Sequence, residues 1–335
     1  MKKETLSGIA VFIIIILVGG GCFWYSRHEK KSAEPKFSNE NPTGNPSGFS
    51  SDTVDSKNSG SQYIAALYVE GVIEDENINY NQKWLLSTIN RLKNDSNNIA
   101  IAMYVNSPGG GVYQADDVYL ALKAYQERGK LFYVYMGPLA ASGGYYISCP
   151  ANMIYANRNT LTGSIGVIAG QLIDATELLD NVGIKIEAVH SGKNKLMGNF
   201  YSDITQEQID IMQSISDECY EQFTGLVAAN RGMSSQKVKA LADGRVYTAA
   251  QALDNGLIDK IDTWDNMIFA LRKKLENENC KVITYKYEHK QTFRESFFGV
   301  FTDLEERQLA SKLGLPLSVL KDLEKFNTYP AYLYK

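Results

Sequence analysis

Residues 99–128 read IAIAMYVNSPGGGVYQADDVYLALKAYQER. The first seven residues are all apolar or aromatic, which predicts a buried β-strand at 99–105. A glycine-rich turn, NSPGGG at 106–111, follows at once, and residues 112–128 have the composition of a helix. A strand, a glycine-rich turn and a helix in direct succession predict a fold of the α/β class.

Neighbouring segments repeat this alternation. Apolar, β-rich runs predict further strands at 64–69, 131–136, 153–155 and 184–189. Helices are predicted at 82–93, 235–242 and 249–255, and a long helix begins at a capping box, Thr205 with Gln208, and ends at Gly232. The spacing favours a parallel sheet covered by helices. An apolar stripe along the long helix indicates core or subunit contact: Ile209, Met212, Cys219, Phe223 and Val227.

Composition excludes several classes of function. The 335 residues are 44% hydrophobic and 21% charged, as in a folded globular protein. The formal net charge of -4 leaves no basic field for nucleic acid. Four widely spaced cysteines, one of them in the N-terminal apolar segment, argue against a disulfide framework, and we expect Cys149 and Cys219 to be small core residues. Because the chain has only three histidines, neither a zinc site nor a histidine base is favoured.

The N-terminal segment has the pattern of a membrane anchor. Residues 5–26 carry no charge, and residues 9–18 are almost purely aliphatic, so we expect one transmembrane helix in a lipid bilayer. A cleaved signal peptide and lipid attachment at Cys22 are the alternatives. Basic residues on both sides leave the orientation open. Residues 32–62 are rich in Ser, Asn, Gly and Pro, which predicts a flexible polar linker.

The turn at 106–111 has two interpretations. Glycines next to a helix N-terminus present backbone N–H groups that bind an anion, as an oxyanion hole does. The alternative is a tight connection with no chemistry. A nucleotide-binding P-loop is disfavoured, because no Gly-Lys-Ser or Gly-Lys-Thr follows the glycines.

Ser142 lies in the small-residue stretch AASGGYYI (140–147), directly after the predicted strand 131–136. A nucleophilic serine needs open approach for an acyl group, and a glycine after it frees an N–H for the oxyanion. The alternative is that Ser142 only caps the following helix.

A serine nucleophile also needs a base. His190, Lys193 and Lys195 lie close together in the sequence, at AVHSGKNK (188–195). A histidine base normally requires an orienting carboxylate, and no motif singles one out. A lysine serves if burial keeps it neutral, although most lysines are solvated surface charges. Ser164, in the glycine-rich stretch TLTGSIGV (160–167), is either a partner for that lysine or a turn residue.

Five ordered motifs together resemble signal peptide peptidase A, peptidase family S49. They are VNSPGG (105–110), ASGGYY (141–146), TGSIGV (162–167), Ser191-Gly192 with the nearby lysines, and GRVY (244–247). The resemblance implies a crotonase-like/ClpP-like α/β fold and a Ser-Lys dyad without metal or cofactor. It implies Ser142 as nucleophile, Lys195 as base, Ser164 as the residue that orients the base, and N–H groups of Gly109 and Gly143 as the oxyanion hole. The family usually has Lys-Asp or Lys-Ser where this chain has Lys195-Leu196, so Lys193 stays a minority candidate.

The resemblance also implies how the protein works in the cell. We expect an endopeptidase that hydrolyses residual signal peptides or other membrane-proximal peptides through an acyl-enzyme. We expect a ring-shaped homo-oligomer, an octamer from the family, with a cytoplasmic N-terminus and an extracellular catalytic domain. A catalytically silent, membrane-tethered peptide-binding scaffold and a crotonase-type acyl-CoA enzyme are the alternatives.

These inferences divide the chain into four parts. The predicted parts are a membrane anchor with its flanks at 1–31, a linker at 32–62, the catalytic domain at 63–285 and a C-terminal extension at 286–335. The last seven residues, YPAYLYK (329–335), are apolar and extended around Pro330. This tail either docks in the substrate cleft or forms a disordered end.

Overall fold

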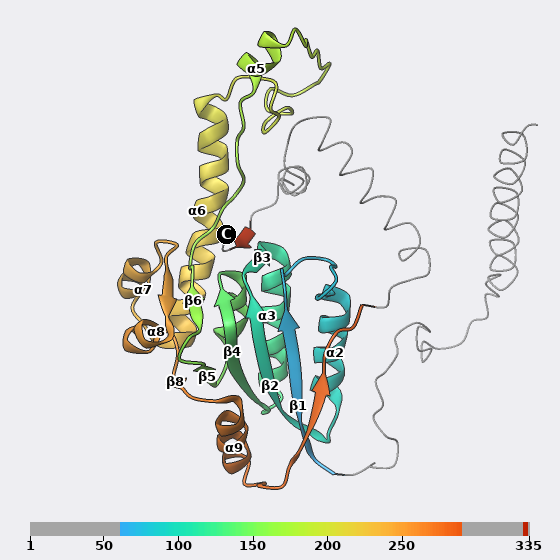
Figure 1. Cartoon of the computed structure of the whole chain (residues 1–335), viewed down its shortest axis with the longest axis vertical. Coiled ribbons are helices and arrows are strands. Elements are labelled where there is room, and N and C mark those ends of the chain that lie inside the picture. Colours follow the sequence, from blue (N-terminus) through green and yellow to red (C-terminus); the bar gives the residue numbers. More distant parts are fainter. Residues whose placement is uncertain (1–60, 290–330, 334–335) are drawn as a thin grey trace, which may run out of the picture. The chain divides into compact units, whose positions relative to one another are not determined.

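The computed structural model describes residues 61–289 and 331–333 (Figure 1). The predicted anchor and almost the whole predicted linker lie outside these residues. Within the described part, no helix is both long enough and apolar enough to cross a membrane.

A sheet of eight strands forms the centre of the fold. Its main path runs β7 (Val246–Thr248), β6 (Leu161–Gly163), β4 (Leu131–Ala141), β2 (Asn98–Ser107), β1 (Tyr63–Glu70) and β9 (Lys281–Tyr285). β5 (Met153–Ala156) pairs with β4, and β8 (Lys260–Ile261) pairs with β5. Every pair in this sheet is parallel except β6 with β7. The predicted α/β class with a mostly parallel sheet is confirmed.

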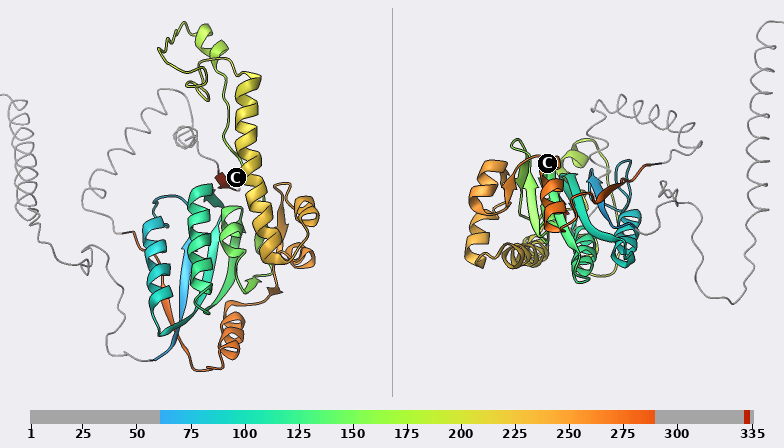
Figure 2. Two further views of the ribbon diagram at one scale, coloured as in Figure 1. Left: turned by 180° about the vertical axis from the view of Figure 1, so that it is seen from behind. Right: turned by 90° about the horizontal axis from the view of Figure 1, so that it is seen from below.

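Helices cover the two faces of the sheet unequally (Figure 2). One face packs against α2 (Gln82–Asn94), α3 (Val112–Gln126), α4 (Gly143–Ser148) and the second half of α6 (Gln206–Arg231). The other face packs against α9 (Trp264–Lys274). Successive strand residues point to opposite faces, so Leu67 joins the larger core while Ile64 joins the smaller one. The short helices α7 (Ser235–Leu241) and α8 (Ala249–Asn255) flank the β7 edge of the sheet.

The predicted long helix is present as α6. Thr205 and Gln208 form the predicted capping box, and Gly232 ends the helix in a left-handed conformation with φ 61°. Its apolar stripe divides between two environments, because Phe223 and Val227 are fully buried whereas Ile209 is 42% exposed. The first half of α6 extends away from the sheet (Figure 1).

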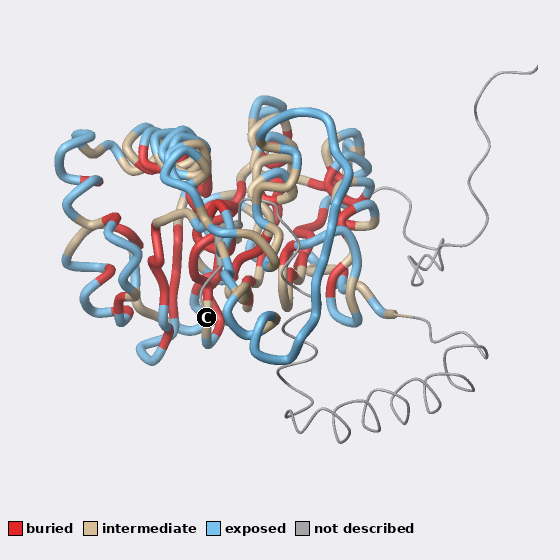
Figure 3. The backbone as a smooth tube through the Cα atoms, turned by 90° about the horizontal axis from the view of Figure 1, so that it is seen from above, coloured by how far each residue is buried: buried red, intermediate tan, exposed pale blue. Residues whose placement is uncertain are grey.

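Residues 166–205, here called the arm, connect the sheet to α6 and correct one prediction. The strand expected at 184–189 is absent: these residues are irregular and exposed, and the only helix of the arm is α5 (Thr176–Asn181) (Figure 3). Alternating apolar residues need a neighbouring strand to form a ladder, and residues 184–189 pair with none of the described strands. Four large apolar side chains of the arm are more than half exposed: Leu178, Val182, Ile184 and Val189.

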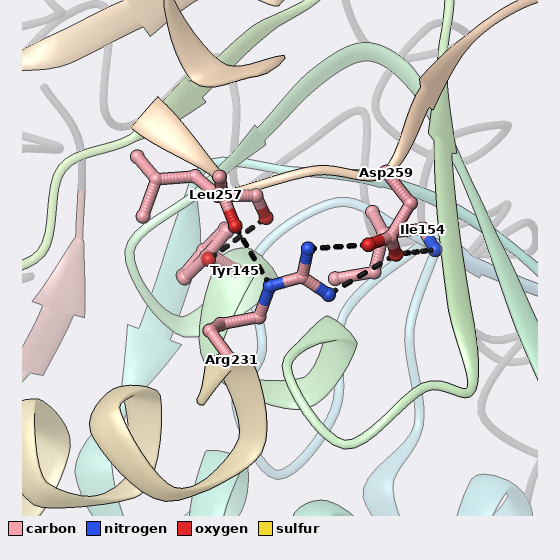
Figure 4. A network of polar contacts seen from close by, with 6 residues as sticks. Tyr145, Ile154, Arg231, Leu257 and Asp259 are labelled. Carbon is pink, nitrogen blue, oxygen red and sulfur yellow. Dashed lines mark hydrogen bonds and ion pairs between the residues drawn. The ribbon is translucent and has the colours of Figure 1, made fainter. Parts of the chain in front are cut away.

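A partly buried ion pair fastens the end of α6 to the sheet (Figure 4). Arg231 donates to both carboxylate oxygens of Asp259, at 3.1 and 2.7 Å, and to the carbonyl oxygen of Gly256 at 3.0 Å. Asp259 also accepts from the backbone N–H of Ile154 in β5 at 2.7 Å. Next to this pair, the Tyr145 hydroxyl of α4 donates to the Leu257 carbonyl oxygen at 2.9 Å. Three elements, α6, β5 and α4, therefore meet at one polar cluster.

We predict that Arg231→Ala lowers the free energy of unfolding by about 2 kcal/mol, because it leaves the partly exposed carboxylate of Asp259 without its ionic partner. The matched control is Lys239→Ala, which removes the exposed ion pair with Glu221 and is expected to cost less than about 1 kcal/mol. Urea unfolding followed by tryptophan fluorescence measures both. Equal losses for the two variants would contradict the structural role given to the Arg231–Asp259 pair.

Candidate active site

Ser142 occupies a strained turn between β4 and α4. Its φ of 54° and ψ of -117° are unusual for a residue with a side chain. Two backbone bonds hold the turn: Ser142 N–H donates to the Gly163 carbonyl oxygen at 2.8 Å, and Tyr146 N–H donates to the Ser142 carbonyl oxygen at 2.9 Å. The strain is therefore maintained by the sheet on one side and by the helix on the other.

The Ser142 hydroxyl is the feature that separates the two sequence interpretations. Ser142 is 1% exposed, and its Oγ is the one buried side-chain polar atom in the described part of the chain that has no hydrogen-bond partner. The side chain makes no capping bond to α4. The interpretation of Ser142 as only a helix cap is therefore wrong. A buried hydroxyl without a partner is costly, which suggests a functional use for it.

Ser164 lies beside Ser142 at the end of the neighbouring strand. β6 pairs with β4 in the register Ala141 to Gly163, so the next residues along, Ser142 and Ser164, leave the sheet together. Ser164 is 7% exposed, has a φ of 49°, and donates its N–H to the Arg245 carbonyl oxygen at 2.8 Å. The structure thus brings together the predicted nucleophile and the predicted partner of its base.

The two predicted oxyanion glycines begin the two elements β3 and α4, both of which lie close to the end of β2. Gly109 begins β3 (Gly109–Gly111) with a φ of 107°, and its N–H donates to the Ser107 Oγ at 3.1 Å. Gly143 begins α4, where an N–H has no carbonyl acceptor within its own helix. A β-carbon on Gly144 would meet the Ser107 carbonyl oxygen at 2.8 Å, so α4 approaches β2 as closely as only glycine allows. Sequence reasoning did not single out Ser107, although its place directly before Pro108 was the available signal.

The C-terminal tail docks next to these glycines. β10 (Ala331–Leu333) pairs antiparallel with β3, with Tyr332 opposite Gly110. On its other side, β3 is held by residue Ile73, whose N–H donates to the Gly109 carbonyl oxygen at 2.8 Å. An extended segment that adds to a strand edge in this way is bound as peptides are bound by β-augmentation. The alternative of a disordered end does not hold for residues 331–333.

The three candidate bases lie in the arm, and none of them bonds to Ser142 Oγ. Lys195 is exposed in a turn where its N–H donates to the Gly192 carbonyl oxygen at 3.1 Å. Lys193 forms an ion pair with Glu207 at the start of α6, and the Asn194 side chain donates to the same carboxylate at 3.0 Å. His190 is exposed, with Nδ1 3.2 Å from the Gly192 carbonyl oxygen. Within one chain, the buried hydroxyl of Ser142 therefore receives no hydrogen bond from the exposed Lys195.

Cys149, at the end of α4, is a second potential nucleophile close to Ser142 in sequence. Burial raises the pKa of its thiol to about 12, so the reactive thiolate is absent at neutral pH. Its side chain is fully buried, as predicted for a small core residue, whereas Cys219 is only half-buried.

Comparison with known proteins identifies relatives for this arrangement. Residues 124–278 match the sequence profile of peptidase family S49. The chain is 33% identical over 230 residues to a protein of Enterococcus faecium described as a candidate signal peptide peptidase SppA, and the match covers 67% of each chain. It is 28% identical over 272 residues to Protease 4 of Haemophilus influenzae, covering 79% of this chain and 44% of that protein.

Two further similarities are more distant. The chloroplastic serine protease SPPA of Arabidopsis thaliana is 30% identical over 201 residues, which are 60% of this chain and 29% of that protein. Among solved structures, a point mutant of ClpP1 from Listeria monocytogenes is 19% identical with a TM-score of 0.41, covering 61% of this chain and 94% of that one.

The sequence profile and the relatives give one consistent result for the class of protein. The chain is a serine peptidase, and the buried Ser142 hydroxyl on its strained turn has no hydrogen-bond partner. The chain belongs to peptidase family S49 and is of the signal peptide peptidase A type.

The docked tail generates a prediction about self-processing. If the β3 edge is where the enzyme binds peptides, the wild-type chain should lose C-terminal residues during long incubation, because its own tail reaches that edge. The Ser142→Ala variant should keep its full mass. Intact-mass spectrometry measures both, and identical C-termini in the two proteins would rule out self-trimming.

Proposed function

We propose that this protein is a membrane-anchored serine endopeptidase with a Ser-Lys dyad, which hydrolyses residual signal peptides or other membrane-proximal peptides. The observation that carries the proposal is the buried, unpaired hydroxyl of Ser142 on its strained turn. The substrates follow from the resemblance to signal peptide peptidase A, together with an anchor at residues 5–26 that would hold the catalytic domain at the outer face of the membrane.

Lys195 is the base that the arm supports best. The Lys193 ammonium already forms an exposed ion pair with the carboxylate of Glu207, so it would have to leave that partner to reach Ser142. The ring of His190 lies next to a backbone carbonyl rather than a carboxylate. Lys195 has neither of these impediments, and its place after Ser191-Gly192 matches the family motif.

The separation of Ser142 from Lys195 supports a site shared between subunits. A lysine that acts as a base must be neutral, and an exposed position in a single chain does not provide that. The arm that carries Lys195 also exposes several large apolar side chains, which a monomer would not gain from exposing. Packing of the arm against a neighbouring copy would bury Lys195 and these apolar side chains together. Successive copies would then close into a ring, with an octamer expected from the family.

In the proposed reaction, Lys195 of a neighbouring subunit accepts the proton as Ser142 Oγ attacks the carbonyl carbon of the scissile peptide. Ser164 orients the lysine. The negative charge that develops on the carbonyl oxygen is stabilised by N–H groups of Gly143 and Gly109. Collapse of the tetrahedral intermediate breaks the C–N bond, and the lysine returns its proton to the leaving amine. Water, deprotonated by the same lysine, then hydrolyses the ester on Ser142.

We predict that Ser142→Ala and Lys195→Ala each lower kcat by more than about 10³-fold, since nucleophile and base act as a unit. The matched controls are Lys193→Ala and His190→Ala, neighbours in the same loop, which should keep kcat within about threefold. A peptidase assay and labelling of Ser142 by a fluorophosphonate measure all four. An inactive His190→Ala with an active Lys195→Ala would refute the lysine mechanism, and a wild type that does not label would favour a silent scaffold.

We also predict that inactive subunits complement each other. Ser142→Ala chains mixed with Lys195→Ala chains under conditions of subunit exchange should regain part of the wild-type activity, because some interfaces then pair an intact serine with an intact lysine. Native mass spectrometry verifies that mixed rings form. Mixed rings without recovered activity would refute the shared site and leave the dyad itself unaffected.

A further inference from the structure

The parts of the proposed site lie on three separate elements. Ser142 directly precedes α4, and the glycines of β3 lead directly into α3. The arm with Lys195 returns to the body of the molecule through α6. Catalysis requires these elements to keep their relative positions to within a fraction of an ångström, because a misplacement of about 1 Å lowers the rate about 100-fold.

One side chain contacts all three elements. Tyr146 in α4 is fully buried, and its hydroxyl donates to Asp116 Oδ1 of α3 at 2.6 Å. The same hydroxyl accepts from Gln222 Nε2 of α6 at 2.8 Å. Its ring packs on Phe223 of α6 at 4.9 Å and on Tyr119 of α3 at 5.7 Å, measured between ring centroids.

The backbone of Tyr146 connects this junction to the nucleophile. Its N–H donates to the Ser142 carbonyl oxygen at 2.9 Å, and this bond is one of the two that hold the strained turn. A shift of the Tyr146 side chain would therefore move the turn itself. The bond to Asp116 is short and goes to a carboxylate, the type of hydrogen bond that resists displacement best.

We propose that Tyr146 is a positioning residue of the peptidase site. Its hydroxyl fixes the nucleophile helix α4 against the helix that follows the oxyanion strand and against the helix that carries the arm. This inference rests on the proposed function. It assigns Asp116 as the acceptor that orients the tyrosine, and neither residue touches the substrate.

The test is the Tyr146→Phe variant of the full-length chain, which keeps the ring and removes only the hydroxyl. We expect kcat for a fluorogenic peptide to fall about 10- to 100-fold with KM changed less than about twofold, since substrate binding at the β3 edge is unaltered. The rate of fluorophosphonate labelling of Ser142 should fall in parallel. The matched control is Tyr125→Phe, which removes a buried tyrosine hydroxyl bonded to Asn98 Oδ1 at 2.7 Å, near the opposite end of α3.

Asp116 provides the second arm of the test. Asp116→Asn retains an oxygen that accepts from Tyr146 and should lose less activity than Asp116→Leu. Asp116→Leu should lower kcat as Tyr146→Phe does but by no larger factor, because Tyr146→Phe also loses the bond from Gln222 Nε2. The double variant Tyr146→Phe with Asp116→Leu should be no slower than Tyr146→Phe alone, because that single variant already breaks the bond to Asp116.

Two results would overturn the proposal. The first is a Tyr146→Phe variant with the kcat of Tyr125→Phe. The second is an Asp116→Asn variant as slow as Asp116→Leu. The first would show that the junction contributes only to stability, which the unfolding midpoints report separately, and the second would show that Asp116 does not act by accepting the hydrogen bond from Tyr146. A wild-type chain that neither cleaves peptides nor labels at Ser142 would instead refute the proposed function.

Discussion

The pairing of β4 with β6 is the constraint on which the site depends. The two parallel strands end together, and the ladder continues for one more bond, from Ser142 N–H to the Gly163 carbonyl oxygen. That bond fixes Ser142 at a positive φ, a conformation that few side chains adopt without support. Because the turn is held from the sheet, the hydroxyl can stay buried and unpaired without relaxing into a local hydrogen bond.

Close backbone packing explains why glycine is needed around this turn. A β-carbon on Gly110 would lie 1.9 Å from the Ile73 carbonyl oxygen, and one on Gly163 would lie 2.6 Å from the Tyr247 ring. These contacts bring β3 against Ile73 and β6 against β7 at distances that a larger residue would prevent. The glycine motifs visible in the sequence therefore serve close backbone packing around the candidate site.

Much of this arrangement was predictable because it depends on short-range patterns. The apolar runs at 64–69, 99–105, 131–136 and 153–155 form parallel strands, and the capping box at Thr205 and Gln208 starts α6. Ser142 was identifiable from its small neighbours. The strand expected at 184–189 was wrong, because a strand requires a partner that the pattern itself does not encode. The junction at Tyr146 was also beyond sequence reasoning, since it joins side chains from three elements far apart in the chain.

The hydrogen bond from Gly109 N–H to Ser107 Oγ affects whether this N–H binds a neutral or an anionic oxygen of the substrate better. Without substrate, Gly109 N–H already donates to Ser107 Oγ, so burying this N–H costs no unsatisfied hydrogen bond. To serve the proposed reaction it must exchange a neutral hydroxyl for the incoming oxygen. A neutral carbonyl gains little from that exchange, whereas an anionic oxygen gains a stronger, charge-assisted bond. In the proposed reaction, the occupied donor would thus bind a tetrahedral anion better than a bound peptide. Such a preference lowers the reaction barrier without stabilising the substrate complex.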